Sequence, residues 1–413
     1  METVHRFILI CLFICTTGLY AQSQFYLNDQ DSIAVERLRN FPNIEVGKGV
    51  SFMPLDSLYK LNLRFRMQNK ASFRFSDEGE VSSELMVRRL RLRFEGFVYS
   101  PKLAYVIQLG FSGADNSGLS GVGNMIRDAI IYYMPTDRWS FGFGQTKIPG
   151  NRARLNSSSA LQFVDRSITN STFNLDRDFG LFATYNNRMA GTFEYVAKAA
   201  VTSGEGRNFQ LSPNAGLAYT TRLELFPLGR FKSLGDVFEG DFEREESPKL
   251  MLAAAYSTNR QAIREAGQRG SLLQNNETRD INSLFIDFIF KYRGFAFYTD
   301  YMMRMVDDPL LFSDNEIFTD QYIFAGQGIN LQSSFILKSN WEFATRYSQV
   351  RADKKVENVA DYKHEEQYTA GITKYVIGHS LKFQFDVSRH VRQLVTGSDK
   401  SFWMTRFQVE LGI

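Results

Sequence analysis

Polar residues, five of them arginines, recur at every second position in two early segments of the chain, Leu61–Gln68 and Arg89–Glu95, with apolar residues between them. In a β-strand, residues two apart point to the same face, so each segment presents a row of guanidinium groups on one side. A guanidinium group binds phosphate or carboxylate through two parallel hydrogen bonds and keeps its charge. The spacing therefore predicts a surface that binds anions.

A later stretch, residues 148–178, is rich in arginine and serine and is long for a simple connection. If it folds into the interior of a barrel, it narrows the pore and supplies further hydrogen-bond donors; a surface loop is the alternative. The residues that we expect to line a pore or to bind anions are Arg64, Arg66, Arg89, Arg91, Arg93, Arg222, Lys147, Arg152, Arg154 and Arg166.

The two early segments are predicted to form a hairpin. This pairing brings Arg66 beside Arg93 and Arg64 near Glu95, so that one carboxylate partly offsets five arginines. Arg88 has the opposite parity and is expected on the outer rim, against lipid headgroups. The alternative interpretation is that these arginines are the water-facing side of a barrel, each paired with a carboxylate across the lumen.

The elements that carry these residues follow from a period of two along most of the chain. Apolar and charged residues alternate over about ten positions, the length of a tilted membrane-spanning strand, whereas soluble strands average five or six. Tyr and Trp on the apolar faces fit interfacial girdles. The sequence predicts an all-β transmembrane antiparallel barrel of about 16 strands, near residues 61–75, 85–98, 102–111, 126–134, 138–147, 179–186, 191–202, 215–226, 249–257, 283–292, 295–302, 328–337, 340–348, 367–376, 380–388 and 402–412.

Short and long links alternate between these segments, as periplasmic turns and external loops do in outer-membrane barrels. An even strand count places both termini on the periplasmic side. About sixteen strands leave a water-filled lumen. One link, residues 227–248, is long where a turn is expected, and we interpret it as a polar periplasmic excursion.

The N-terminus has the pattern of a secretory signal peptide, with an apolar run over Phe7–Ile14 and cleavage expected after Ala21. Cleavage removes both cysteines of the chain. The predicted organisation is a signal peptide over 1–21, a periplasmic N-terminal segment over 22–60, and a barrel over 61–413 whose loop 148–178 folds inward.

Composition excludes several other classes of protein. The 413 residues carry 48 Lys and Arg against 45 Asp and Glu, a net charge of +3 that is too balanced for a nucleic-acid binder. After the leader, no apolar run approaches 18 residues, which excludes a helical membrane protein. The four histidines have no metal-ligand spacing, and no nucleophile or phosphate-loop motif occurs. We expect neither enzymatic activity nor a metal or other cofactor.

Three neighbouring motifs, Gly144–Pro149, Arg154–Ser158 and Leu161–Ser167, resemble the central signature of the phosphate-selective porin O and P family. Arg88–Gly96 resembles an early strand of that family, and the resemblance spans roughly residues 60–413. It implies a sixteen-stranded outer-membrane channel, commonly trimeric, with an arginine ladder and an inward-folded third loop. The Ala21-Gln22 junction is also similar to that of exported Bacteroidetes proteins.

The leading hypothesis is an ion channel of the porin type in the outer membrane of a Gram-negative bacterium. It would allow passive diffusion of small solutes with an anion bias, for phosphate or other anions. Its expected partners are small anionic solutes, outer-membrane lipid and lipopolysaccharide, and two further copies in a homotrimer, with no nucleic acid. The second hypothesis is a non-conducting structural or secretion-associated barrel, plugged by residues 22–60 or 148–178.

Overall fold

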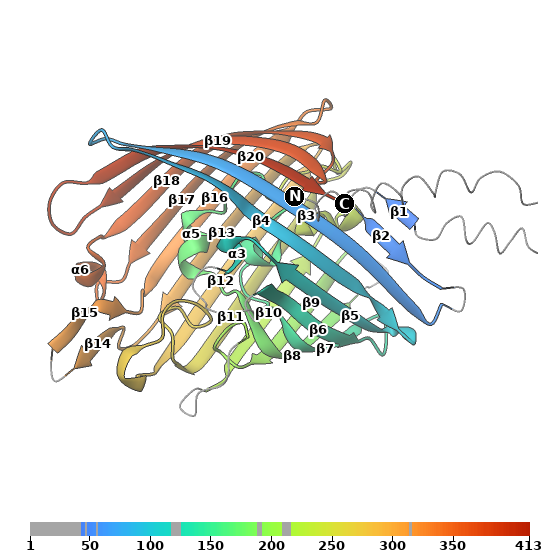
Figure 1. Ribbon diagram of the computed structural model, residues 1–413, viewed down its shortest axis with the longest axis horizontal. Coiled ribbons are helices and arrows are strands. Elements are labelled where there is room, and N and C mark those ends of the chain that lie inside the picture. Colours follow the sequence, from blue (N-terminus) through green and yellow to red (C-terminus); the bar gives the residue numbers. More distant parts are fainter. Residues whose placement is uncertain are drawn as a thin grey trace, which may run out of the picture. The chain divides into compact units, whose positions relative to one another are not determined.

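Sixteen antiparallel strands close into a barrel in the computed structural model, which describes residues 43–45, 48–54, 57–116, 125–187, 192–208, 216–313 and 316–413 (Figure 1). These strands are β3 (Tyr59–Ser76), β4 (Val81–Val98), β5 (Ser100–Gly110), β6 (Ile126–Tyr133), β7 (Trp139–Lys147), β8 (Arg177–Asn187), β9 (Glu194–Thr202), β10 (Ala218–Phe226), β11 (Lys249–Ala262), β12 (Arg279–Tyr292), β13 (Phe295–Met305), β16 (Gly326–Ile336), β17 (Trp341–Ala352), β18 (His364–Ile377), β19 (Leu381–Gln393) and β20 (Lys400–Gly412).

The barrel closes where β20 pairs with β3, with Phe402 opposite Ser76 and Gly412 opposite Arg66. The closed sheet leaves no unpaired edge between its first and last strands, as hydrocarbon surroundings require. Beyond the end of β20, the start of β3 pairs instead with the short strand β2 (Gly49–Phe52). The other elements are β1 (Asn43–Glu45), β14 (Leu310–Ser313), β15 (Glu316–Tyr322), α3 (Gly113–Asn116), α4 (Arg152–Leu155), α5 (Ile168–Phe173), α6 (Glu357–Ala360), η2 (Lys232–Val237) and η3 (Gln274–Asn276).

Each of the sixteen segments expected from the alternation is a strand, so the predicted fold class and strand count are confirmed. The strands differ from expectation mainly in length: β3 and β4 have 18 residues each and are joined by a turn over only 77–80. The expected signal peptide, 1–21, and residues 22–42 of the expected N-terminal segment lie outside the described residues.

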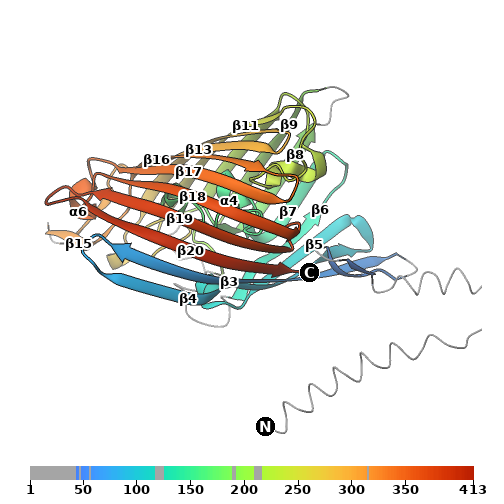
Figure 2. The same cartoon turned by 90° about the horizontal axis from the view of Figure 1, so that it is seen from above.

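Most short links gather at one end of the barrel, called here the turn end, and most long loops at the other, called the loop end (Figures 1 and 2). The turn 77–80 at the loop end and the long link 227–248 at the turn end are the exceptions. Tight links at the turn end include 293–294 and 337–340, whereas the loop end carries 263–278 and 353–363. The C-terminal residue Ile413 lies at the turn end, where its backbone N–H donates to Phe65. The expected alternation of short and long links is present in the described chain.

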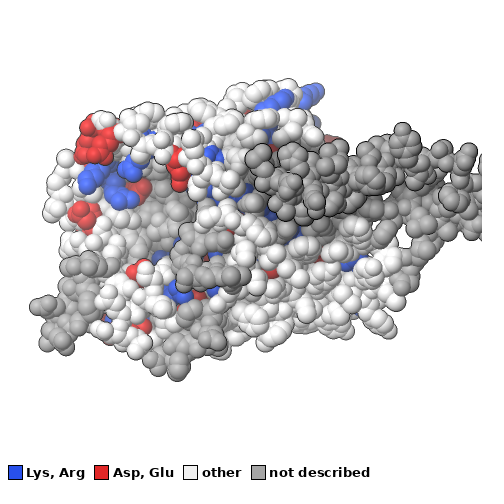
Figure 3. All heavy atoms as spheres, viewed as in Figure 1, with Lys and Arg blue, Asp and Glu red and all other residues white. Residues whose placement is uncertain are grey.

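The outward face of the barrel is apolar over most of its height. Exposed Leu, Ile, Phe and Tyr side chains alternate with buried polar ones, as along β10, where every second residue from Ala218 is buried. The side seen in Figure 3 is mostly uncharged, with acidic and basic side chains grouped toward the loop end. No helix among the described residues has the length and apolar character needed to cross a membrane.

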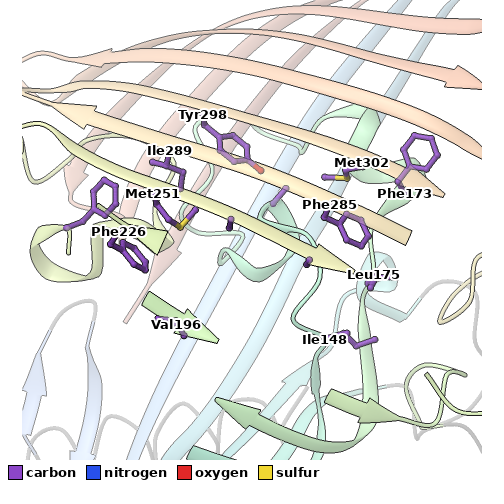
Figure 4. Close-up of a cluster of buried hydrophobic side chains, with 14 of the residues drawn as sticks. Ile148, Phe173, Leu175, Val196, Phe226, Met251, Phe285, Ile289, Tyr298 and Met302 are labelled. Carbon is purple, nitrogen blue, oxygen red and sulfur yellow. The ribbon is translucent and has the colours of Figure 1, made fainter. Parts of the chain in front are cut away.

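The interior is not uniformly polar, because a buried apolar cluster lies inside the barrel (Figure 4). Met251, Phe285 and Met302 point inward from neighbouring strands β11, β12 and β13. They pack with Phe173 and Leu175, which belong to the link between β7 and β8. Burial of a large apolar side chain contributes about 1.5–3 kcal/mol, so this cluster is a strong reason for that link to fold inward.

Candidate functional site

The link between β7 and β8, residues 148–176 and called here the lumen loop, crosses the interior of the barrel. On one side, Arg66 of β3 donates hydrogen bonds to Ser157 and Ser158. On the opposite side of the barrel, Arg222 of β10 donates to the carbonyl of Gly150 at 2.9 Å. The loop is therefore held by side chains on both walls.

Gln162 makes the central contacts of this crossing. Its side-chain amide donates to Ser334 at 2.5 Å and to Glu342 at 2.7 Å, and its backbone carbonyl accepts from Thr373 at 3.1 Å. The ammonium group of Lys382 donates to the carbonyls of Ser159 and Leu161, each at 2.8 Å. These bonds satisfy the backbone of a buried loop, which would otherwise be costly.

The long link at the turn end, residues 227–248 and called here the turn-end insert, also folds into the lumen. Glu239 accepts a hydrogen bond from the backbone N–H of Gln162 at 3.0 Å, which joins the insert to the lumen loop. The Lys291 ammonium donates to three insert carbonyls, those of Gly235, Phe238 and Gly240. The interpretation of this link as a polar periplasmic excursion was therefore wrong, because its backbone and acidic groups find their partners inside the barrel.

The lumen loop and the insert together fill the part of the lumen that is bounded by strands β9 to β13 and β16 to β19. Charged side chains there are shielded from water, and several of them are paired. Arg222 donates to both oxygens of Asp287, at 2.7 and 2.9 Å, and to Glu224 at 2.7 Å. Arg152 of the lumen loop lies 3.4 Å from the same Glu224 and 3.6 Å from Asp236 of the insert.

Arg152 and Arg222 were expected in a pore lining, but both are only 2% exposed and neither lines the main cavity. The parity of Arg222 was read correctly, since the side chain points inward. The alternation shows which side chains point inward. It does not show that the lumen loop and the turn-end insert cover this part of the wall, which buries Arg222 in protein.

A large cavity remains along the rest of the lumen, with a volume of about 1550 Å³. Its lining includes Lys48 and Ile413 at the turn end and Gln268 and Leu272 at the loop end, so it reaches both ends of the barrel. Fifteen Lys and Arg residues line it, against five Asp and Glu: Lys48, Arg64, Arg66, Arg88, Arg89, Arg91, Arg93, Arg127, Lys147, Arg154, Arg166, Arg177, Arg207, Arg264 and Arg269, with Asp115, Asp128, Asp176, Glu205 and Glu243. The lining is thus far more basic than the whole chain.

The arginine hairpin has a register different from the one expected. Arg66 lies opposite Arg91, and Arg64 lies opposite Arg93, so guanidinium groups face each other directly across the two strands. The expected contact between Arg64 and Glu95 does form, although these residues are not directly opposite. The expected pairing assumed a connecting loop over 76–84. The turn at 77–80 is tighter, and it shifts the pairing by two residues.

Arg88 is also placed differently from the expectation of an outer-rim, lipid-facing residue. A β-bulge interrupts the pairing here: Gln68 lies opposite Arg89, and the next residue of β3, Asn69, lies opposite Val87. Arg88 is the extra residue, and a bulge re-aims side chains. Its guanidinium points inward and donates to Asp165 of the lumen loop at 3.2 Å.

Two of the carboxylates along this cavity each hold two cations. Asp115 accepts from Arg91 at 2.8 Å and from Arg127 at 2.9 Å. Asp176 accepts from Arg154 at 2.8 Å and Arg177 at 3.3 Å. Burial alone would raise the pKa of Asp176, but Arg154, Arg177 and Arg127 outweigh it and hold that pKa well below its usual range. These acids stay ionised and still leave an excess of positive charge.

Three of the expected site residues are held by neutral acceptors. Arg89 donates to the Gln68 amide at 2.6 Å, Lys147 to the carbonyls of Leu155 and Asn156, and Arg166 to the carbonyl of Asn156 at 3.1 Å. No carboxylate of the described residues lies within 4.0 Å of their charged nitrogens. Burial and the neighbouring Arg154 lower the pKa of Arg166 to about 9, a sign of unneutralised positive surroundings.

The structure brings eight of the ten expected residues to this cavity: Arg64, Arg66, Arg89, Arg91, Arg93, Lys147, Arg154 and Arg166. Sequence reasoning missed Arg127 and Arg177, which also line it. Both lie at loop-end termini of strands, where the alternation is too short to set parity. An adjacent acid, Asp128 for Arg127 and Asp176 for Arg177, was the available signal.

Known protein families and solved structures resemble this barrel. Residues 61–228 match the model of the family described as phosphate-selective porin O and P, which confirms the resemblance over that part of the chain. No curated protein matches the chain. The family match and the porin fold point to a channel rather than an enzyme, and they indicate a protein of the Gram-negative outer membrane.

Solved structures of similar fold cover most of the chain at low identity. The outer membrane channel DcaP of Acinetobacter baumannii is 11% identical, with a TM-score of 0.54 over 89% of this chain and 100% of its own. An anion-selective porin from Comamonas acidovorans is 9% identical, with a TM-score of 0.53 over 86% and 100%. OmpF of Salmonella typhi, in complex with daunomycin, is 11% identical, with a TM-score of 0.54 over 87% and 99%. The chain is thus a sixteen-stranded barrel of porin fold whose residues 61–228 match the phosphate-selective porin O and P family.

Proposed function

We propose that this protein is an outer-membrane porin through which small solutes diffuse passively, with a preference for anions such as phosphate. The observation that carries the proposal is the lining of the 1550 Å³ cavity, where fifteen basic residues outnumber five acidic ones. Rings or rows of Arg and Lys favour anions in a pore. Each guanidinium group of such a row can bind two oxygens of a phosphate and keeps its charge.

The anion path proposed here runs along β3 and β4, past Arg64, Arg93, Arg66 and Arg91, and then past the lumen loop. Arg89, Lys147 and Arg166 add positive charge, and among the described residues their hydrogen bonds go to neutral acceptors. Arg152 and Arg222 are left out of the path, since both lie in buried ion pairs. The similar fold of an anion-selective porin from Comamonas acidovorans is consistent with this assignment.

The test is the reversal potential of the purified barrel in a planar bilayer under a salt gradient, repeated with added phosphate. An anion-selective channel whose current phosphate blocks is the expected result. A conducting channel without selectivity would mean that the carboxylates neutralise the arginines, leaving a general porin. Absence of any conductance would overturn the proposal.

The second candidate is a non-conducting structural or secretion-associated barrel with a plugged lumen. The observation that favours it is the inward folding of two segments from opposite ends, the lumen loop and the turn-end insert, which meet at Gln162 and Glu239. An N-terminal plug formed by residues 22–60 is a separate possibility. Deletion of residues 22–59 tests it, because removal of a plug raises the conductance sharply, whereas a conducting porin changes little.

The remaining organisation is proposed on the same basis. We propose a signal peptide over 1–21, a periplasmic segment over 22–60 and a homotrimer of barrels, each surrounded by outer-membrane lipid and lipopolysaccharide. The apolar outward face supports the contact with lipid. Chemical cross-linking in native membranes and N-terminal sequencing of the purified protein test the trimer and the cleavage site.

A further inference from the structure

A second group of polar side chains lies at the loop end of the cavity, away from the arginine hairpin. Glu205 and Gln268 both line the cavity and are only 1% and 6% exposed. Neither oxygen of Glu205, and neither polar atom of the Gln268 amide, has a hydrogen-bond partner of normal geometry among the described residues. Buried polar groups are nearly always satisfied, so a pair of unsatisfied ones requires an explanation.

The loop that carries Glu205 is rigidly built. Asp178, at the start of β8, accepts hydrogen bonds from the Ser203 hydroxyl at 2.5 Å and from the backbone N–H of Gly204 at 2.6 Å and Gly206 at 3.2 Å. Both glycines have positive φ, +86° and +89°, which other residues adopt only with strain. Glu205 is therefore held between two fixed turns and is not free to swing to another partner.

The loop that carries Gln268 is fixed against the first. Residues 264–272 form a tight hairpin in which Arg264 pairs with Leu272. A Cβ atom at Gly206 would lie 2.3 Å from the carbonyl oxygen of Gln268, so the two backbones are in direct contact. The unsatisfied carboxylate and amide thus come from loops that the fold holds side by side.

The charges around this pair are mostly positive. Arg207 and Arg269 line the same cavity, and the Nε atom of Arg264 lies 4.0 Å from a Glu205 oxygen. A buried carboxylate without close hydrogen bonds lowers the stability of the fold. It gives no advantage to a porin that selects only anions without a hydrogen-bond donor. A solute that carries a donor group next to its anionic group would satisfy both kinds of residue at once.

We propose that Glu205 and Gln268 form a selectivity subsite that binds the hydroxyl or ammonium group of organic anions carrying such a donor. The inference rests on the proposed anion-porin function and deepens it by naming a solute class. Arg207 and Arg269 attract the anionic end of the solute, while Glu205 accepts from its donor. Gln268 offers both an acceptor and a donor to the same group.

The experiment compares malate with succinate, which have the same charge and differ in one hydroxyl group. Block of the single-channel current by each anion is measured with the full barrel in a planar bilayer at pH 8. Malate is expected to bind about tenfold more tightly than succinate, the size of a hydrogen bond to a charged acceptor. Glu205→Ala and, independently, Gln268→Ala bring this ratio close to one.

Arg91→Ala is the matched control, because Arg91 lies in the arginine hairpin and not in the subsite. It weakens block by both anions and leaves the malate-to-succinate ratio unchanged. Equal block by malate and succinate in the unmodified barrel overturns the subsite and leaves the anion porin standing. Failure of both anions to block overturns the anion-porin function, and the subsite with it.

Discussion

The two sides of the lumen start from the same strand pattern and end in opposite states. On the side of β3 to β8, inward arginines outnumber acids and line an open cavity. On the side of β10 to β19, inward charges such as Arg222 and Asp287 are paired, covered and dry. The difference comes from what lies over the wall. The lumen loop has polar contacts on both sides, but together with the turn-end insert it packs against the side of β10 to β19 and covers it.

This comparison separates two uses of the same residue type. An arginine in the dry half holds the loops in place, because neither water nor solute can reach it to replace its carboxylate or carbonyl partner. In the open half, the more exposed arginines, such as Arg64 and Arg93, keep water on one side and remain available to an anion. The predictions below test whether the two halves respond to mutation in these two different ways.

The largest effect on stability is expected from Asp287→Ala in the dry half. Removing one partner of this buried ion pair leaves Arg222 to share Glu224 with Arg152 and Lys198, and costs about 3–5 kcal/mol in free energy of unfolding. Denaturant titration followed by circular dichroism measures the loss. Glu95→Ala is the counterpart in the open half, where its partners Arg64 and Arg93 line the cavity and are about a third exposed, so that water replaces the lost carboxylate. Equal destabilisation by both substitutions would contradict the distinction.

The largest effect on selectivity is expected from Arg66→Ala combined with Arg91→Ala. Each removes a charge-assisted contact of about 1.5–3 kcal/mol, so phosphate block weakens by at least tenfold. Arg260→Ala is the control, since Arg260 is an exposed residue paired with Asp280 away from the cavity. The blocking constant is measured from the single-channel current as phosphate is added. An unchanged blocking constant would rule out the hairpin as the anion path.

A smaller change is expected from Lys291→Met, which tests what keeps the insert inside the lumen. The substitution leaves three buried carbonyls without their donor, at about 1–3 kcal/mol in total, and loosens residues 235–240. Single-channel recordings should show larger conductance and more current noise. Lys249→Met is the control, because Lys249 donates to one exposed carbonyl of the same link. Identical recordings from both variants would show that the insert does not border the pore.

The smallest effect is a pH dependence of selectivity. Burial raises the pKa of Glu205 to about 7, outweighing the charge of Arg264, while Asp178 raises it further. The carboxyl is neutral below that pKa and negative above it, so anion preference is higher at pH 6 than at pH 8. The change should stay below about twofold, since salt screens a single charge within about 10 Å.

Reversal potentials at the two pH values measure this dependence, and Glu205→Gln should abolish it. His379, which also lines the cavity, stays neutral over this range because burial and the nearby Lys382 lower its pKa to about 3. A pH dependence that persists in Glu205→Gln would assign the titration to another group.

Much of the fold could be predicted from local pattern alone. The period of two located every barrel strand, because each strand has one face toward lipid and one toward the lumen. The inward parity of Arg64, Arg66 and Arg91 followed from the same alternation. Parity failed at Arg88, because a bulge adds one residue and local sequence carries no mark of it.

The inward position of the insert was missed for a different reason. Its partners, Gln162, Lys291 and Gln332, lie far away in sequence, and no local pattern joins them to Glu239. A usable signal existed in β12, where Phe285 and Ile289 make the inward face apolar as well as the outward one. A barrel strand that is apolar on both faces needs protein on its inner side.

The sequence by itself determined the barrel, the number of its strands and the row of arginines, since alternation and strand length are local properties. The tertiary structure decided which of those arginines line open space. That outcome depends on two inserted segments whose contacts span the whole barrel, and on a register set by a turn and a bulge. Whether an arginine can bind an anion depends on the groups around it, and only folding of the chain brings those groups together.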